Sequence, residues 1–119
     1  MKVIIKRPCD QFGEEATIPN TLKALQEAVG GYIETTPTCL SGLVMVVNEE
    51  GKLMGLPFNN TATDLARGLY ESIVGNAVIM EVKGSELAPL ELADLGKIAA
   101  FAASSNIRTR PMETEEDDE

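Results

Sequence analysis

The chain has 119 residues, of which 44% are hydrophobic and 4% aromatic, and its formal net charge is −9. This length allows one domain, and its core must be built from aliphatic side chains. The small number of aromatic residues argues against a surface that stacks bases or sugars.

The negative charge is concentrated at the end of the chain. Residues 113–119 contain six acids and no base, which leaves thirteen acids and ten bases in residues 1–112. No basic stripe is visible, so direct binding to nucleic acid is disfavoured. A terminal run of like charges repels itself and stays solvated. We therefore expect a single domain over residues 1–104 and a disordered acidic tail over residues 105–119, either solubilising or functional.

Several features indicate a cytoplasmic protein without membrane contact. The apolar part of the opening segment, residues 2–7, is too short for a signal peptide, and the longest apolar stretch, residues 43–47, is far shorter than a membrane span. Cys9 and Cys39 belong to no C-x-x-C pair. We expect both to be reduced thiols.

The first third of the chain predicts a hairpin followed by a helix. Residues 2–7 are rich in β-branched side chains, and residues 15–18 alternate polar with apolar, so the two segments are expected to pair. Asn20 or Thr21 is a suitable cap for a helix with an apolar stripe. Gly30 and the glycine after it end that helix.

The middle of the chain predicts three strands. Residues 32–36 form one, and residues 43–48 form a stronger one whose unbroken apolar character indicates burial on both faces. Residues 48–51 have the composition of a hairpin turn, which predicts a partner strand over residues 52–56. Residues 59–61 are expected to be a loop.

The last third predicts a helix, a strand and a final helix. Thr63 is the expected cap of a helix that runs to about Ile73, and residues 77–83 form a strand. The final helix starts near Glu91, and order is expected to fade after Ser104. This order of elements predicts one α+β domain with a mixed, mostly antiparallel sheet of four to six strands and two or three helices. Its opening hairpin and helix are typical of β-grasp folds.

The residue types exclude most catalytic and metal-binding arrangements. The chain has no histidine, which removes the commonest general base and the commonest zinc ligand. Two cysteines alone do not complete a zinc site. Gly30 and its neighbouring glycine follow a helix, whereas a phosphate-binding loop precedes one. We therefore identify no catalytic residue, metal site or cofactor.

Two sequence phrases carry a family resemblance. They are VGGYIE at residues 29–34 and NEEGKLMGLPFN at residues 48–59, supported by residues 20–26 and 73–79. Together they resemble the family called domain of unknown function 3846, over about residues 1–95. The resemblance implies an origin in phages, plasmids or conjugative elements, often near anti-restriction or replication genes. It implies no activity and no catalytic residue.

Three hypotheses on function follow. The leading one is a non-enzymatic binding module of a phage or mobile element that acts on a host or element protein or on a small ligand, with counter-defence as one setting. The second is an acidic DNA mimic that inhibits a restriction or defence nuclease. The third is a carboxylate- or metal-dependent enzyme, for which the only ligand pool is Glu34, Glu49, Glu50 and Asp64. The candidate binding surface consists of Tyr32, Glu34, Asn48, Gly55, Phe58, Asn59 and Asn60.

Overall fold

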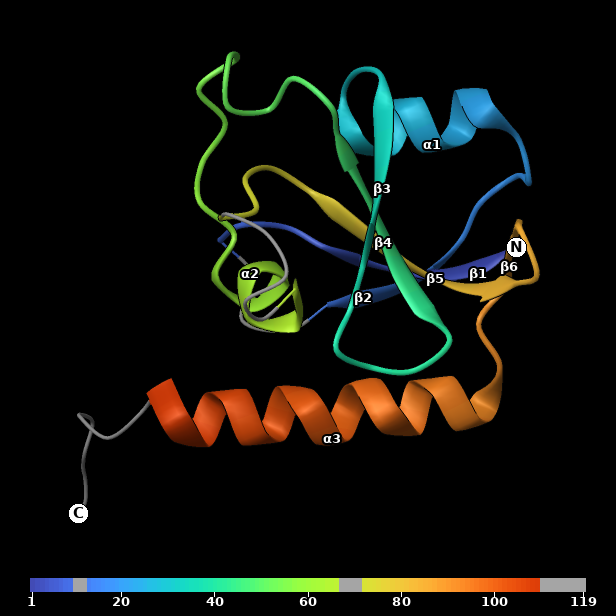
Figure 1. Cartoon of the computed structure of the whole chain (residues 1–119), viewed down its shortest axis with the longest axis vertical. Coiled ribbons are helices and arrows are strands. Elements are labelled where there is room, and N and C mark those ends of the chain that lie inside the picture. The colour runs from blue at the N-terminus through green and yellow to red at the C-terminus, as the bar shows by residue number, and fades with distance from the viewer. Residues whose placement is uncertain (10–12, 67–71, 110–119) are drawn as a thin grey trace.

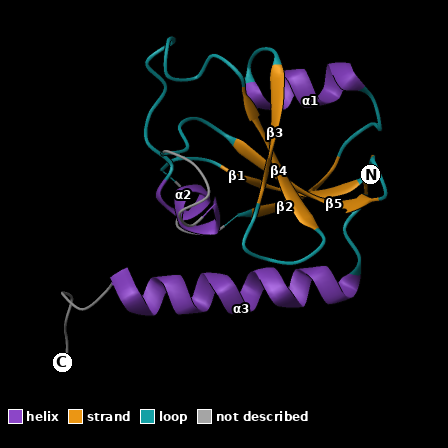
Figure 2. Cartoon of the chain, viewed as in Figure 1, coloured by secondary structure: helices purple, strands orange, loops and turns teal. Residues whose placement is uncertain are grey.

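One β-sheet with helices on both faces makes up the fold (Figures 1 and 2). The computed structural model describes residues 1–9, 13–66 and 72–109. The elements, in chain order, are β1 (Lys2–Lys6), β2 (Glu14–Thr17), α1 (Leu22–Val29), β3 (Ile33–Pro37), β4 (Leu43–Asn48), α2 (Asn60–Ala66), β5 (Ala77–Lys83), β6 (Glu86–Ala88) and α3 (Leu92–Thr109).

The strand order in the sheet is β2-β1-β5-β4-β3, and β6 pairs with the end of β5. Every pairing between the described strands is antiparallel. The predicted α+β class and strand number are confirmed, and the sheet is antiparallel rather than mixed. The likeness to a β-grasp fold ends after β1, β2 and α1, because a β-grasp sheet has a parallel central pair.

Alternation along the strands divides the core into two layers. On β5, Val78 and Met80 join the layer under α1, whereas Ala77 and Ile79 join the layer under α2 and α3. The residues of β4 alternate in the same way, because successive side chains of a strand point to opposite faces. The predicted burial of β4 on both faces is confirmed.

Local signals explain the first hairpin and α1. The predicted hairpin is present, because β1 and β2 pair antiparallel, with Lys2 opposite Thr17. The Thr21 hydroxyl accepts a hydrogen bond from the Ala24 N–H at 3.1 Å and caps α1. Gly30 ends the helix at φ 81°, a left-handed conformation that glycine adopts without a steric penalty.

The predicted strand over residues 52–56 is wrong. Residues 49–55 form successive turns, although the turn over residues 48–51 is present, with the Gly51 N–H donating to the Asn48 carbonyl at 3.2 Å. The returning chain cannot pair with β4, because β4 already pairs with β3 on one side and β5 on the other. The sequence also lacks the alternation of a strand over this stretch.

The predicted bounds of the second helix are also wrong. The helix α2 starts at Asn60 rather than at Thr63, because the side-chain amide oxygen of Asn59 accepts a hydrogen bond from the Ala62 N–H at 3.2 Å and caps the helix. Residues 59–61 are therefore a cap and a first turn, not a loop. Ile73 lies outside any helix, and residues 67–71 lie outside the described residues.

Two further differences lie at the strand and helix ends. Pro37 is the last residue of β3 instead of its stop, which an edge strand tolerates because one side of it needs no N–H donor. The short strand β6 was not predicted. It forms a hairpin with β5 across Gly84, which has φ 64°.

The helix α3 continues to Thr109, five residues past Ser104. The acids at residues 113–119 that motivated the expected tail lie outside the described residues. In the described part of the chain, no helix combines the length and apolar character needed to cross a bilayer.

Candidate functional site

An open groove with a volume of about 290 Å³ lies where β3 and β4 meet the following loop. Glu34 and Thr36 of β3 form one wall, and Val47 and Asn48 lie at the end of β4. Residues 49–53 and 72–74 complete the lining. The groove therefore lies on the sheet face that carries α2 and α3, since Val47 and Ile73 belong to that core layer.

Residues 49–58, here called the platform loop, are held by backbone hydrogen bonds. The donor–acceptor pairs within it are Met54 N with Glu50 O at 3.0 Å, Gly55 N with Lys52 O at 3.1 Å, and Leu56 N with Gly51 O at 3.0 Å. Its end is fixed to the segment before β5, because the Pro57 carbonyl accepts from the Gly75 N–H at 2.7 Å and Phe58 bridges to Val74. The platform loop is therefore an ordered connection, although it contains no helix or strand.

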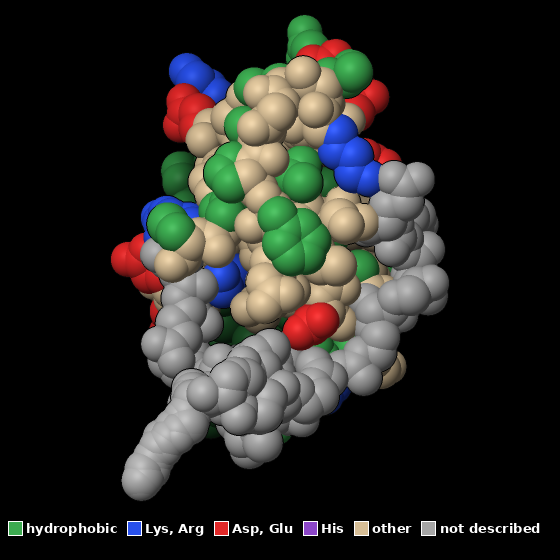
Figure 3. All heavy atoms as spheres, turned by 90° about the vertical axis from the view of Figure 1, so that its left-hand side faces the viewer, with side chains coloured by type: hydrophobic (Ala, Val, Ile, Leu, Met, Phe, Trp, Pro, Cys, Tyr) green, Lys and Arg blue, Asp and Glu red, His purple; other side chains and the backbone are tan. Residues whose placement is uncertain are grey.

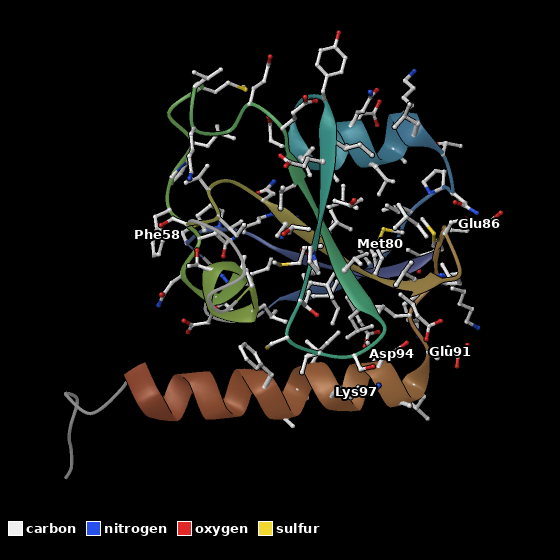
Figure 4. All side chains as sticks on the ribbon, in the orientation of Figure 1. Phe58, Met80, Glu86, Glu91, Asp94 and Lys97 are labelled. Atoms are coloured by element: carbon white, nitrogen blue, oxygen red, sulfur yellow. The ribbon has the colours of Figure 1, made fainter. Side chains whose placement is uncertain are left out.

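This ordered loop exposes large apolar side chains to solvent. Leu53 is 89% exposed, Met54 is 53% exposed and Phe58 is 51% exposed. Phe58 points outward at the edge of the molecule (Figure 4). The face that carries it has hydrophobic side chains along its middle and most charged side chains toward its margins (Figure 3). Exposed apolar side chains that gather on one face make the platform loop a candidate interaction surface.

Asn59 is fully buried and holds three segments together. Its amide donates to the Lys6 carbonyl at 2.9 Å and to the Gly75 carbonyl at 2.8 Å, while its oxygen caps α2. A buried amide with all three bonds made is a structural element. Asn59 therefore lies behind the surface and supports the end of the platform loop.

Asn48 plays a similar role at the start of the platform loop. Its amide donates to the Val29 carbonyl at 3.1 Å, and its oxygen accepts from the Glu50 N–H at 2.8 Å. Asn48 is 6% exposed, so it lines the groove but directs its polar atoms into the protein. It connects the end of α1 to the first turn of the loop.

Thr36 behaves differently from the two asparagines. It lines the groove and is 5% exposed, yet its hydroxyl oxygen has no hydrogen-bond partner among the described residues. A buried polar group without a partner costs about 1–3 kcal/mol. Among the described residues that line the groove, Thr36 is thus the one whose buried side-chain oxygen makes no hydrogen bond.

The groove carries an acidic rim. Glu34, Glu49 and Glu50 line it and are exposed, and Lys52 is the described basic residue among the lining. Asp64, the fourth member of the predicted ligand pool, lies on α2 outside the lining. No group of three or more Cys, Asp or Glu side chains suited to hold a metal ion occurs among the described residues.

The predicted surface residues are only partly brought together. Glu34 and Asn48 line the groove, and Tyr32 lies beside it, because its carbonyl accepts from the Glu49 N–H at 2.9 Å. Gly55 turns the platform loop with φ 71°, and Phe58 is exposed at the end of this loop. The remaining two residues lie at the start of α2, with Asn60 exposed and Asn59 buried.

A second polar cluster lies where β5 meets α3 (Figure 4). Asp94 is buried and accepts from the Glu91 N–H at 2.9 Å, which caps α3. Burial raises the pKa of Glu81 above its ordinary value of 4.5, and a hydrogen bond to Asp94 and the charges of Asp94 and Glu91 raise it further, against an opposing effect of Lys83. This cluster fastens α3 to the sheet.

Lys83 belongs to the same cluster. Its ammonium lies 2.7 Å from the Glu91 carboxylate and 3.5 Å from the Glu81 carboxylate. The hydrogen bond from Lys83 to Glu91 is the main reason that the pKa of Lys83 is raised above 10.5.

A family model for the "Domain of unknown function (DUF3846)" matches residues 1–100. The chain belongs to this family. The match includes β1 through the first half of α3, so the groove and the platform loop both lie inside the family domain. The resemblance seen in the two sequence phrases is thereby confirmed. No curated protein and no solved structure matches the chain.

Sequence reasoning missed Thr36, Leu53 and the segment 72–74. Leu53 and Met54 stand between Gly51 and Gly55 without alternation, a pattern that could have indicated exposed apolar residues in a turn. Thr36 and residues 72–74 carry no local signal, because only the fold places them beside the platform loop.

Proposed function

We propose that this member of the family is a non-enzymatic binding module and that it recognises a protein through the platform loop and the adjoining groove. The observation that carries the proposal is the combination of an ordered backbone with exposed Leu53, Met54 and Phe58. Ordering a flexible loop upon binding opposes association, whereas a loop that is already ordered avoids this loss. Exposed apolar side chains on such a loop are suitable anchors for a partner.

The partner is a host protein or a protein of the element that encodes this chain, and counter-defence is one setting for the encounter. This context rests on the family resemblance alone. We place the encounter in the cytoplasm, where the exposed and free thiols of Cys9 and Cys39 would stay reduced. A small ligand in the groove is the alternative within the same class.

The test compares two double variants of the full chain as baits for proteins from a host lysate. The variant L53S/F58S changes the platform loop. The control L22S/L92S changes Leu22, which is 59% exposed on α1, and Leu92, which is 84% exposed on α3. Both double variants remove two exposed apolar side chains, so any loss of non-specific hydrophobic binding affects them equally.

The proposal is supported if the wild type and the control capture the same protein and L53S/F58S captures at least tenfold less of it. Equal capture by all three baits contradicts the location of the site. Asn59 is left unchanged because its burial means that a substitution would disturb the fold.

The DNA-mimic hypothesis receives less support from the described domain. A mimic needs a rigid array of unpaired carboxylates, whereas Glu14 lies 2.7 Å from Arg7 and Glu91 lies 2.7 Å from Lys83. These two carboxylates are therefore paired, and residues 113–119 hold the densest run of acids in the sequence. Deletion of these residues should abolish inhibition of a defence nuclease if they carry it, and leave inhibition intact if the domain does.

A carboxylate- or metal-dependent enzyme is the third hypothesis. Glu34, Glu49 and Glu50 at the groove are its remaining candidates. Calorimetric titration of the full chain with Mg²⁺ and Mn²⁺ tests it, since the hypothesis requires binding that E34Q weakens.

A further inference from the structure

We infer that the groove binds an arginine side chain presented by a basic segment of the partner protein. This inference deepens the proposed function and rests on it, because it names the chemistry recognised beside the platform loop. Three properties of the groove lead to arginine: the charge of its rim, the character and size of its interior, and the unsatisfied hydroxyl in its wall.

The rim favours a cation. The described residues that line the groove include three acids, Glu34, Glu49 and Glu50, and one base, Lys52, which already interacts within the chain. Counted over these described residues, the rim carries a net negative charge even with Lys52 included. Complementary charge at a rim accelerates association and rejects partners of the wrong sign. A phosphate or a nucleotide would be repelled here.

The interior favours a cation on an apolar stem. Val47 and Ile73 are almost completely buried and, with Val74, give the groove an aliphatic part. A bare metal ion would leave this surface uncovered, and a purely apolar side chain would desolvate the carboxylates without pairing them. A guanidinium on three methylene groups meets both requirements, because its stem packs on apolar surface while its planar head pairs with carboxylates.

The size of the groove agrees with a single side chain. Its volume of about 290 Å³ lies at the lower limit of small-molecule pockets, which usually measure about 300–1,000 Å³. An extended side chain enters such a groove, whereas a cofactor-sized molecule does not.

The wall offers an unused hydrogen-bonding group. Thr36 is 5% exposed, and its hydroxyl has no partner among the described residues. Arginine carries five N–H donors, so it can satisfy two carboxylates and still donate to a hydroxyl. The hydroxyl oxygen is covered in the empty groove, so this contact requires a side-chain rotation as arginine enters.

The experiment follows the backbone amide signals of the ¹⁵N-labelled full chain during titration with three capped tripeptides. Their sequences are Leu-X-Leu, with X as arginine, as its neutral isostere citrulline or as glutamate. We expect the arginine peptide to shift the amides of Glu34, Thr36 and Val74, and to bind at least fivefold more tightly than the citrulline peptide. The glutamate peptide should leave these signals unchanged.

Two charge-matched variants separate the groove from the overall charge. E49Q/E50Q removes two rim charges. We expect it to lower the affinity for the arginine peptide about three- to tenfold and to leave the affinity for the citrulline peptide almost unchanged. E27Q/E86Q removes the same charge at exposed sites that do not line the groove. It should leave both affinities unchanged.

Equal affinity for arginine and citrulline would overturn the inference, as would the absence of shifts at Glu34, Thr36 and Val74 at millimolar arginine peptide. Either result leaves the proposed function standing if L53S/F58S still loses its captured protein. Conversely, an arginine peptide that binds the groove while L53S/F58S captures its partner normally would support the inference and contradict the platform loop as the contact site.

Discussion

Asn59 and Thr36 are both buried polar residues near the platform loop, but the protein treats them in opposite ways. Asn59 makes three hydrogen bonds to three separate segments, whereas the Thr36 hydroxyl makes none to the described residues. The difference assigns Asn59 to the scaffold and Thr36 to the candidate site. The amide-rich phrase that looks most functional in the sequence builds the support, and the less conspicuous residues around it form the surface.

The largest effect should come from removing the support. N59A leaves the Lys6 and Gly75 carbonyls and the Ala62 N–H without their side-chain partner, all at buried positions. Each such loss costs about 1–3 kcal/mol, so we expect the free energy of unfolding to fall by roughly 3 kcal/mol or more. Urea denaturation measures this change.

The neighbouring exposed residue is the matched control. N60A should change the free energy of unfolding by no more than about 0.5 kcal/mol, since Asn60 is exposed. If N59A and N60A were equally mild, the assignment of Asn59 as scaffold would be wrong.

A second pair of variants compares two threonines two residues apart. The Thr38 hydroxyl donates toward the Leu43 carbonyl at 2.9 Å and accepts from the Leu40 N–H at 3.0 Å. We expect T38V to lower the free energy of unfolding by about 1–2 kcal/mol. T36V removes a hydroxyl without a described partner and should be neutral or stabilising by up to about 1 kcal/mol. A larger loss in T36V than in T38V would show that the Thr36 hydroxyl is bonded after all.

The contrast between Asn59 and Thr36 also shows which parts of the fold and of the candidate site could be predicted from the sequence. The first hairpin, α1 and the central strands follow from local alternation and caps, so they could be predicted. The partners of Asn59 could not, because the Lys6 carbonyl lies 53 positions away in the chain. The strand expected at residues 52–56 failed for the same reason, since β4 finds its second partner in the distant β5.

The β5–α3 cluster gives the stability of the fold a pH dependence. The pKa of Glu81 is raised in the folded protein, mainly by burial and by the hydrogen bond to Asp94. The folded state therefore binds this proton more tightly than the unfolded chain does. The stabilisation is complete below pH 4.5 and is lost as the pH rises through the folded pKa.

E81Q mimics the protonated side chain and should remove this component. We expect the stability of E81Q relative to wild type to increase as the pH rises from about 4 to about 8, in urea titrations at several pH values. A constant difference between E81Q and wild type would contradict the assigned origin of the pKa shift.

The smallest effect on stability should come from the surface that the scaffold supports. L53S/F58S should change the free energy of unfolding by less than about 1 kcal/mol, because Leu53 is 89% exposed and Phe58 is 51% exposed. Thermal unfolding of L53S/F58S and of the wild type, followed by circular dichroism, measures this change. A loss of several kcal/mol would mean that these side chains belong to the core.

The central claim is that the platform loop is ordered while its apolar side chains remain in solvent, and amide hydrogen exchange of the free full chain tests it most directly. The N–H groups of Met54, Leu56 and Asn59 donate to backbone carbonyls. We predict that they exchange at rates comparable with the amides of α1. Exchange of these three amides at the rates of an unfolded chain would contradict the account, because a disordered loop presents no fixed surface to a partner.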